Sequence, residues 1–374
     1  MPDLLKKIIA FLFMLTVLGS AAGVIRHRAS IINREEDPVK FHEALYYKKA
    51  VGDIVQCQLC PHQCVLAAGQ YGRCKARKNI AGRLYSIVYG KIATWHVDPI
   101  EKKPFFHVLP GHEAFSIATT GCNLQCLFCQ NWEISQTLPF DIKTQDAAPA
   151  DIVAQARQRG VSAIAFTYSE PTISFEYVLD IAKLAKAAGI KTLMVSNGYI
   201  AQEPLRELLK YIDAYKIDFK GFDEEFYKKL TGGHLQPVLD SLKTIHDSGV
   251  WLEIVTLLVT GQNDTDPQIR ALVRWVKENL GPDVPLHFSR FSPQYKMLNV
   301  PSTPPETVIR ARAIAIEEGL KYVYTGNIAY APGETTFCPE SGDKAIIRQG
   351  MSTVYNGLNH GTCADGEKIP GLWD

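Results

Sequence analysis

Cys122, Cys126 and Cys129 have the spacing in this chain that is most informative about chemistry, a CxxxCxxC motif directly after a predicted strand. Three thiolates from one short loop suit a [4Fe-4S] cluster, where four cysteines are usual and soft sulfur matches iron. One iron would then lack a protein ligand, and a small molecule could chelate it, as in metal sites that keep an open position. The alternative is a zinc site that takes a fourth ligand from elsewhere.

A second group of four cysteines lies upstream, at Cys57, Cys60, Cys64 and Cys74. Four thiols this close indicate a tetrahedral zinc site or an additional cluster, in which His62 could replace one ligand. We expect a structural metal here, because a metal would compensate for the small core of such a module. Reduced, metal-free thiols are the alternative.

The elements that must position these residues follow from the pattern after residue 114, where short β-branched or aromatic runs alternate with amphipathic segments. This pattern is typical of βα units around a parallel sheet. The predicted strands are 115–119, 163–168, 191–195, 214–218, 251–258, 285–290 and 321–325, and the predicted helices are 150–159, 175–188, 204–210, 236–247, 266–280 and 304–318. Because six or seven units are fewer than the eight of a closed barrel, we expect a partial, open (β/α)6 barrel of the TIM type, with a doubly wound sheet as the alternative.

Chemistry in either architecture gathers at the carboxyl ends of the strands. Lys216, Asp218 and Lys220 alternate along the fourth predicted strand and should share one face. Charges that face a barrel interior are costly unless they are paired or bind a ligand. We therefore expect Asp218 and Lys220 to contact cofactor or substrate, with a structural ion pair as the alternative.

Three further polar residues lie on the next two predicted strands: Glu253 on the fifth, and His287 and Arg290 on the sixth. Arg290 could bind a carboxylate through two hydrogen bonds. His287 is a candidate catalytic residue or a core histidine with satisfied hydrogen bonds, and Glu253 is a weaker candidate.

The stretch TTGCNLQCLFCQNWEISQ at 119–136 resembles the cluster loop of radical S-adenosylmethionine (radical SAM) enzymes. More narrowly, the chain resembles the radical SAM enzyme of the AmmeMemoRadiSam system, a relative of pyruvate formate-lyase activating enzymes, over roughly residues 40–374. The other matching segments are DPIEKKPFFHVLPG at 98–111, TYSEPTISFEY at 167–177, HFSRFSP at 287–293 and YTGN at 324–327.

The resemblance implies that the three cysteines of the loop hold a [4Fe-4S] cluster whose unique iron takes the amino and carboxylate groups of S-adenosylmethionine. Phe128 would lie near the adenine. Glu170, in the turn after the second strand, corresponds to the acidic position that receives the methionine ammonium. A carboxylate that caps the following helix is the alternative for Glu170.

Ser196 and Asn197 end the third predicted strand, where similar enzymes contact the ribose or carboxylate of the cofactor. An ordinary strand-to-helix turn would also use Asn-Gly at this point. In similar enzymes, the residues at the positions of His287 and Arg290 line the substrate cavity.

The implied activity is oxidoreductase chemistry that belongs to the cofactor rather than to side-chain acids and bases. One electron, from a donor such as flavodoxin or ferredoxin, would cleave S-adenosylmethionine to methionine and a 5′-deoxyadenosyl radical, which abstracts hydrogen from an unknown substrate. That substrate is a small molecule or a protein, and a true glycyl-radical-enzyme activase is one possibility. The alternative class is a membrane-tethered iron-sulfur protein that only transfers electrons.

Composition bounds these hypotheses. The chain has 374 residues and a net charge of +1, with 40 basic and 39 acidic residues, so nothing favours nucleic acid as a partner. Seven of the nine cysteines fall between residues 57 and 129, which argues against a framework of paired disulfides and for a reducing compartment.

An uncharged run from Ile8 to Ile25 follows Lys6 and Lys7 and precedes Arg26. Its length predicts a membrane anchor, with a cleaved signal and export as the alternative. Basic residues after the run favour a catalytic body on the cytoplasmic side. The predicted organisation is an anchor or signal at 1–30, a cysteine-rich module at 31–110, the barrel at 111–330 and a tail at 331–374.

The tail carries a degenerate cysteine knuckle. Relatives often have two CxxC pairs there, whereas here Ser341 follows Cys338 and Gly366 follows Cys363. Since a zinc site needs four ligands, we expect no metal in the tail. Cys338 and Cys363 should be buried thiols or, as an alternative less compatible with a reducing compartment, a disulfide.

Overall fold

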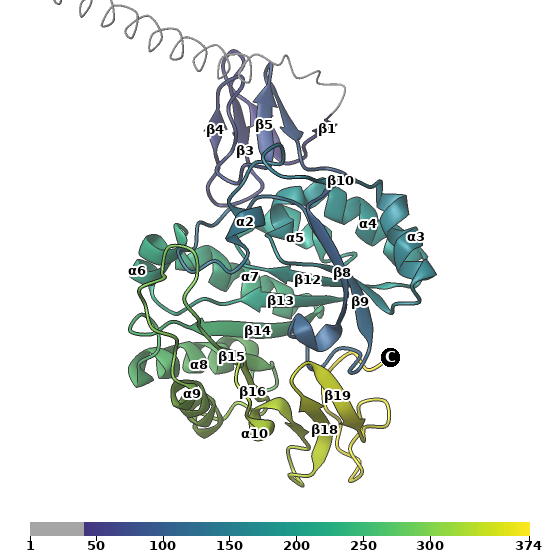
Figure 1. Ribbon diagram of the computed structural model, residues 1–374, viewed down its shortest axis with the longest axis vertical. Helices are drawn as coiled ribbons and strands as arrows, with labels where there is room; N and C mark the ends of the chain where they lie inside the picture. Colours follow the sequence, from purple (N-terminus) through teal and green to yellow (C-terminus); the bar gives the residue numbers. More distant parts are fainter. Residues whose placement is uncertain (1–40) are drawn as a thin grey trace, which may run out of the picture. The chain divides into compact units, whose positions relative to one another are not determined.

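The computed structural model describes residues 41–374, and within them eight strands form one main sheet. Its order is β16-β15-β14-β13-β12-β11-β9-β8 (Figure 1). Strands β9 and β11 to β16 are parallel to their neighbours and follow one another in chain order. A doubly wound sheet reverses its order at a switch point. The unbroken sequential order therefore identifies a barrel-type α/β fold, left open between β16 and β8.

All seven predicted parallel strands and all six predicted helices of the barrel are confirmed. The strands are β9 (Glu113–Ala118), β11 (Ala163–Phe166), β12 (Lys191–Ser196), β13 (Ala214–Asp218), β14 (Trp251–Leu258), β15 (Leu286–Arg290) and β16 (Val323–Gly326). The helices are α3 (Pro149–Gln158), α4 (Phe175–Ala187), α5 (Gln202–Leu208), α7 (Leu235–Asp247), α8 (Asp266–Leu280) and α9 (Pro305–Glu317). Short helical turns connect them: α2 (Trp132–Ser135), η3 (Pro171–Ser174), α6 (Glu224–Phe226), η4 (Tyr227–Thr231) and α10 (Ala331–Glu334).

Strand β8 (Thr94–Pro99) was not predicted. It pairs antiparallel with β9 and so adds an edge strand to the barrel sheet, on the amino-terminal side of the boundary predicted at residue 110. The turn η2 (Ile100–Lys102) and the residues that follow enter the barrel from its amino-terminal end. Apolar side chains of this segment pack against small side chains of the strands: Ile100, Phe105, Val108 and Leu109 against Ala114, Ala163, Ala165, Leu193 and Ala214. We call residues 100–109 the barrel plug.

The cysteine-rich module consists of short antiparallel strands. They are β1 (His42–Glu43), β2 (Tyr47–Lys49), β3 (Val55–Cys57), β4 (Val65–Leu66), β5 (Arg77–Ile80) and β6 (Arg83–Ser86), in two sheets of order β1-β6-β5 and β2-β3-β4, while β7 (Lys91–Ile92) pairs with β10 (Gln145–Asp146). The Arg77 guanidinium joins the module to the barrel, because it forms an ion pair with Glu176 of α4 in which both side chains are buried. Arg77 also donates to the Leu45 carbonyl at 2.8 Å.

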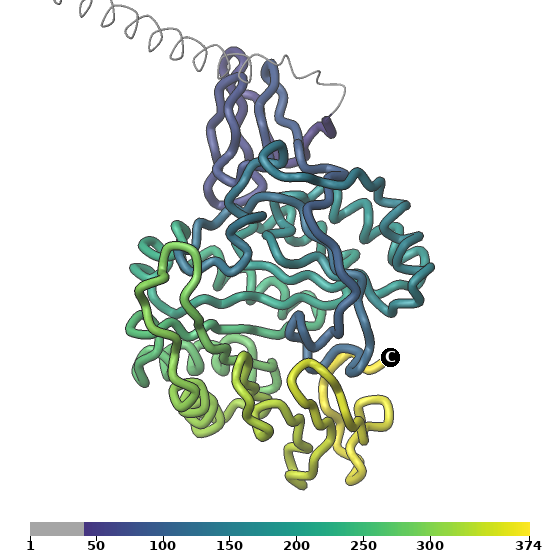
Figure 2. The backbone as a smooth tube through the Cα atoms, in the orientation of Figure 1, coloured from purple at the N-terminus to yellow at the C-terminus, as the bar shows by residue number. Residues whose placement is uncertain are grey.

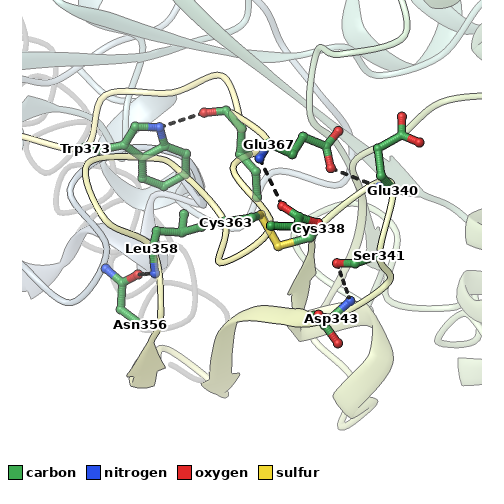
Figure 3. The surroundings of a disulfide bond; sticks show 11 residues. Cys338, Glu340, Ser341, Asp343, Asn356, Leu358, Cys363, Glu367 and Trp373 are labelled. Atoms are coloured by element: carbon green, nitrogen blue, oxygen red, sulfur yellow. Dashed lines mark hydrogen bonds between the residues drawn. A yellow bond between two sulfur atoms is a disulfide. The ribbon is translucent and has the colours of Figure 1, made fainter.

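The tail forms a small sheet of β17 (Thr336–Phe337), β18 (Lys344–Gln349) and β19 (Ser352–Asn356). Beyond it the chain returns to the barrel plug, where Leu372 pairs with Val108 (Figure 2). Cys338 and Cys363 form a disulfide with a Cα–Cα distance of 6.2 Å (Figure 3). Of the two alternatives for these thiols the structure therefore has the disulfide. The number of cysteines and the expected reducing compartment could not predict this disulfide, because it depends on turns that bring together residues 25 positions apart.

The predicted anchor at 1–30 lies outside the described residues. Between residues 41 and 374, no helix has the length and apolar character needed to cross a membrane.

Replacing Arg77 with Met should destabilise the chain by about 3–5 kcal/mol, because the buried Glu176 carboxylate would lose its charge partner. The measurement is the free energy of unfolding in urea. Arg83→Met is the matched control: its ion pair with Glu43 is about half exposed, so the loss should stay below about 1 kcal/mol. Equal losses in the two variants would contradict this role of Arg77.

Candidate functional site

The cysteine loop, residues 119–131, begins where β9 ends, at the carboxyl edge of the barrel sheet. Cys126 is buried, while Cys122 and Cys129 are partly exposed. Burial raises the pKa of Cys122, and the negative charges of Glu170 and Cys126 raise it further. Burial raises the pKa of Cys126 to about 11, although Lys220 opposes this shift. Cys122 and Cys126 therefore need a cationic partner to become thiolates together.

Polar groups of the chain surround the loop sulfurs. The Leu124 amide donates to the Cys122 sulfur at 3.4 Å, and the Asn197 side-chain amide lies 3.7 Å from the same sulfur. The Ser135 hydroxyl lies 3.1 Å from the Cys129 sulfur. Such donors stabilise thiolate ligands of an iron-sulfur cluster and tune its potential. The donor set therefore fits the predicted [4Fe-4S] cluster, with Cys122, Cys126 and Cys129 as its ligands.

Glu170 is buried at the end of β11 and accepts three hydrogen bonds. The Thr172 amide and the Ser196 hydroxyl donate to Oε1 at 3.0 and 2.7 Å, and the Asn197 amide donates to Oε2 at 2.8 Å. Burial raises the pKa of Glu170 in spite of these bonds. A carboxylate has about four acceptor positions, so one remains for a cation. Glu170 thus caps η3, the alternative considered for it, and is also able to receive an ammonium.

Asn197 connects Glu170 with the cysteine loop. Its side-chain amide donates to Asn123 Oδ1 at 2.9 Å, and its Oδ1 accepts from the Tyr199 amide at 2.8 Å. Asn123 in turn donates to the Tyr199 carbonyl at 2.6 Å. The Asn197 side chain is therefore occupied in holding the loop, a role that its position after a strand did not reveal.

The cysteine-rich module also holds the loop. His62 Nε2 lies 2.8 Å from the Asn123 carbonyl, and the Lys75 ammonium donates to the Gln136 carbonyl at 2.6 Å. A side chain on Gly121 would lie 2.4 Å from the Cys74 carbonyl, so only glycine permits this approach. The sequence contained one sign of it, a glycine directly before the first cysteine of the loop.

The four upstream thiols lie near one another, and burial together with the neighbouring thiols raises the pKa of Cys60. Burial raises the pKa of Cys74 to about 11, and Cys57 and Cys64 raise it too. Yet no three His, Cys, Asp or Glu side chains in residues 41–374 converge as the ligands of a single metal ion would. His62 faces the loop instead of the thiols, and Cys57 accepts a hydrogen bond from Arg77 at 3.8 Å. The expected zinc therefore has no support in this geometry. A cubane cluster holds its ligand sulfurs further apart than a single ion does, so this finding does not bear on a cluster at either group of cysteines.

Asp218 and Lys220 lie at the end of β13, beside the loop. Asp218 forms ion pairs with Lys216 and with Lys220, the latter at 3.4 Å. The Lys220 ammonium also lies 5.8 Å from the centre of the Phe128 ring. Burial lowers the pKa of Lys220, but Asp218 and Cys126 outweigh it and raise the pKa. The structure thus combines the ion pair considered as an alternative with a cation directed at the cysteine loop.

Glu253 and His287 lie away from the loop, near the amino ends of β14 and β15. The His287 Nε2 lies 2.7 Å from Glu253 Oε2, and both residues are buried. Glu253 also accepts from the backbone amides of Phe106 and His107 in the barrel plug. This arrangement agrees with a core histidine that has satisfied hydrogen bonds, and Glu253 binds the plug. Arg290, at the carboxyl end of β15, donates to the Thr303 carbonyl at 2.7 Å.

The profile of the Radical SAM superfamily matches residues 116–276. An uncharacterized protein of Methanocaldococcus jannaschii is 44% identical over 306 residues, which are 82% of this chain and 91% of that protein. The pyruvate formate-lyase-activating enzyme of Clostridium pasteurianum is 28% identical over 159 residues, 42% of this chain and 66% of that enzyme. Among solved structures, Streptococcus suis SuiB bound to S-adenosylmethionine is similar over 61% of this chain and 53% of its own, with 17% identity and a TM-score of 0.45.

The contacts around the plug predict a pH dependence of stability. Burial lowers the pKa of His107 to about 4, against about 6.5 in an unfolded chain. As the pH falls from 6.5 to 4, the unfolded chain binds this proton first, so the free energy of unfolding should fall by roughly 3 kcal/mol from His107 alone. Urea titrations across this range measure the slope, which should be shallower in His107→Gln. His246 is exposed, and His246→Gln should keep the slope of the unchanged chain; identical slopes in the two variants would contradict the role of His107.

Proposed function

The chain belongs to the radical SAM superfamily, and we propose that it reductively cleaves S-adenosylmethionine at a [4Fe-4S] cluster held by Cys122, Cys126 and Cys129, in order to oxidise a substrate by hydrogen abstraction. The observation that carries the proposal is the convergence of these three thiols with the buried Glu170 carboxylate, through Asn197, at one edge of the sheet. That edge is where α/β barrels assemble their active sites.

When bound, the cluster supplies the electron that splits S-adenosylmethionine into methionine and a 5′-deoxyadenosyl radical. The residues of the chain hold and orient the reactants. Glu170 has an acceptor position left for the methionine ammonium, and its burial makes that charge-assisted bond stronger. The Lys220 ammonium offsets the negative charge of the thiolates. Phe128, which is buried beside Lys220, offers an apolar surface for the adenine.

The same arrangement favours catalysis over simple electron transfer. An electron carrier needs the cluster ligands but has no use for a buried carboxylate that keeps an acceptor free. The apolar side chains of the barrel plug also fill the amino-terminal end of the barrel, which closes that end to water. A reactive radical requires such a dry and shaped site.

Three finer assignments are part of the proposal. The segments at 98–111 and 167–177 support membership of the AmmeMemoRadiSam group of activating-enzyme relatives. The electron donor is a flavodoxin or a ferredoxin. The run from Ile8 to Ile25 anchors the chain to a membrane, with the barrel on the cytoplasmic side. A glycyl-radical enzyme encoded beside the gene would favour an activase instead of the AmmeMemoRadiSam group.

Anaerobic reconstitution of the chain with iron and sulfide, followed by dithionite and S-adenosylmethionine, should yield 5′-deoxyadenosine. Cys126→Ala should abolish this product, because two thiolates cannot hold the cluster. A double Cys338→Ser and Cys363→Ser variant is the matched control, since it removes sulfurs that lie outside the loop, and it should keep the activity. Product in Cys126→Ala, or none from the unchanged chain with a full cluster, would refute the proposed function.

His62→Phe should lower the rate of 5′-deoxyadenosine formation by roughly 2- to 10-fold, the effect expected for losing one hydrogen bond of about 0.5–1.5 kcal/mol. Phenylalanine keeps an aromatic ring that can pack on Tyr199, as the His62 ring does, but it loses the hydrogen bond with the Asn123 carbonyl. His62→Gln restores a donor and should recover most of the rate. If both variants match the unchanged chain in rate, the module does not position the loop.

A further inference from the structure

The turn after β11 contacts both ends of the cysteine loop. The Ser169 hydroxyl donates to the carbonyl of Thr119, the first residue of the loop, at 2.7 Å. The side-chain amide of Asn131, the last residue of the loop, donates to the Tyr168 carbonyl, also at 2.7 Å. The next residue of the turn is Glu170, the carboxylate proposed to receive the methionine ammonium. The position of this turn therefore affects the cluster loop and the cofactor carboxylate together.

Tyr168 has an unfavourable backbone conformation in this turn. Its φ is +65°, in the left-handed region that is strained for a bulky residue. Such a conformation persists only where the surrounding contacts enforce it, and it is found mostly at functional sites. The bonds to Thr119 and Asn131 hold the backbone of the turn, and the hydroxyl of Tyr168 is bonded to residues outside the turn.

Asp98 of β8 anchors the Tyr168 hydroxyl. The hydroxyl donates to Asp98 Oδ2, and the Lys103 ammonium donates to the same oxygen at 2.6 Å. This ammonium also donates to the Tyr168 hydroxyl at 3.3 Å and lies 4.9 Å from the centre of the Tyr168 ring. Asp98 and Lys103 are both buried. A buried ion pair therefore fixes the far end of the Tyr168 side chain.

The ionisation of these groups agrees with the hydrogen bonds. Burial raises the pKa of Asp98, but the hydrogen bonds from two lysines and from Tyr168 outweigh this effect and lower the pKa. Burial raises the pKa of Tyr168, and the hydrogen bond with Asp98 raises it further. Near neutral pH, Asp98 is therefore an ionised acceptor and Tyr168 a protonated donor. A hydrogen bond of this charge-assisted kind is roughly twice as strong as one between neutral groups.

The anchor lies outside the parallel strands that carry the cysteine loop and Glu170. Asp98 belongs to the antiparallel edge strand β8, and Lys103 belongs to the barrel plug. Asp98 and Tyr168 are 70 positions apart in the sequence. The hydrogen bond between them therefore connects the edge strand and the plug directly with the turn after β11.

We propose that Asp98 is a positioning residue for the cleavage of S-adenosylmethionine, and that it acts on the cysteine loop and on Glu170 through the hydroxyl of Tyr168. This inference deepens the proposed function and rests on it. Without the bond to Asp98, Tyr168 loses a contact that holds its backbone at a positive φ. The turn then relaxes, the bonds to both ends of the loop loosen, and Glu170 moves away from its place beside the loop.

Amide hydrogen exchange of residues 119–131 in the metal-free full chain tests the connection without cluster or cofactor. Tyr168→Phe keeps the ring and removes the hydroxyl, so exchange in the loop should become about tenfold faster, as expected for losing a charge-assisted bond. Asp98→Asn should also speed exchange, but it should add little in the Tyr168→Phe background, because both changes weaken the same bond. Exchange in α8 reports on folding and should stay unchanged.

Two further variants separate positioning from general stabilisation. Lys102→Met is the matched control: Lys102 donates to the other oxygen of Asp98, Oδ1, at 2.7 Å and is partly exposed, so exchange in the loop should not change. Tyr168→Gly removes the anchor together with the strain, because glycine adopts a positive φ freely. The loop should therefore exchange more slowly in Tyr168→Gly than in Tyr168→Phe.

In the reconstituted chain, Tyr168→Phe should weaken S-adenosylmethionine binding by about tenfold, and Lys102→Met should not, as measured by titrating the spectrum of the reduced cluster. Equal exchange in Tyr168→Phe and Lys102→Met, or additive effects of Asp98→Asn and Tyr168→Phe, would overturn the inference. So would faster exchange with unchanged cofactor affinity, since Asp98 would then only stabilise the fold. If the unchanged chain binds no S-adenosylmethionine, the proposed function fails, whereas the exchange data still report on the connection between Asp98 and the loop.

Discussion

The hydrogen bonds of Asn197 hold the candidate site together. Its backbone amide binds Glu170, and its side chain binds Asn123 and approaches the Cys122 sulfur. A single residue at the end of β12 thus fixes the carboxylate proposed to receive the cofactor relative to a thiol proposed to hold the cluster. The cysteine-rich module also contacts the loop. Its Cys74 carbonyl packs closely against Gly121, and its His62 side chain lies within hydrogen-bond distance of the Asn123 carbonyl. Contacts from both the barrel and the module therefore hold the loop in position.

These contacts give the cysteine-rich module a structural role, the positioning of the cysteine loop, that does not depend on a metal. Its contacts with the loop come from Cys74 itself and from residues beside or between its cysteines: His62 lies on the Asn123 carbonyl, and Arg73 donates to the Gln125 side chain at 3.2 Å. Lys75, directly after Cys74, donates to the Gln136 carbonyl just beyond the loop. The buried ion pair between Arg77 and Glu176 holds the module on α4. Changes within the module are thus transmitted to the loop through very few bonds.

Much of the barrel could be predicted because its signals are local. Alternation of β-branched runs and amphipathic segments located every parallel strand and its helix, and strand order in a βα repeat follows from the chain itself. The positions of Glu170, Asn197 and Lys220 at one edge also followed, since parallel strands end on the same side. The pairing of Glu253 with His287 did not, because their depth in the barrel depends on where the plug enters. The strand and the plug that precede the barrel in sequence carry no periodic signal, so β8 was not predicted. The disulfide of the tail was left open because it depends on turns that bring together residues 25 positions apart.

The central claim is that three sulfurs at the edge of the barrel hold a cubane cluster that binds a sulfonium nucleotide. Electron paramagnetic resonance of the anaerobically reconstituted, dithionite-reduced chain tests it most directly. The account predicts the signal of a reduced [4Fe-4S] cluster, and a change in that signal when S-adenosylmethionine is added. Zinc bound at the three cysteines, or a cluster signal that the nucleotide leaves unchanged, would contradict it.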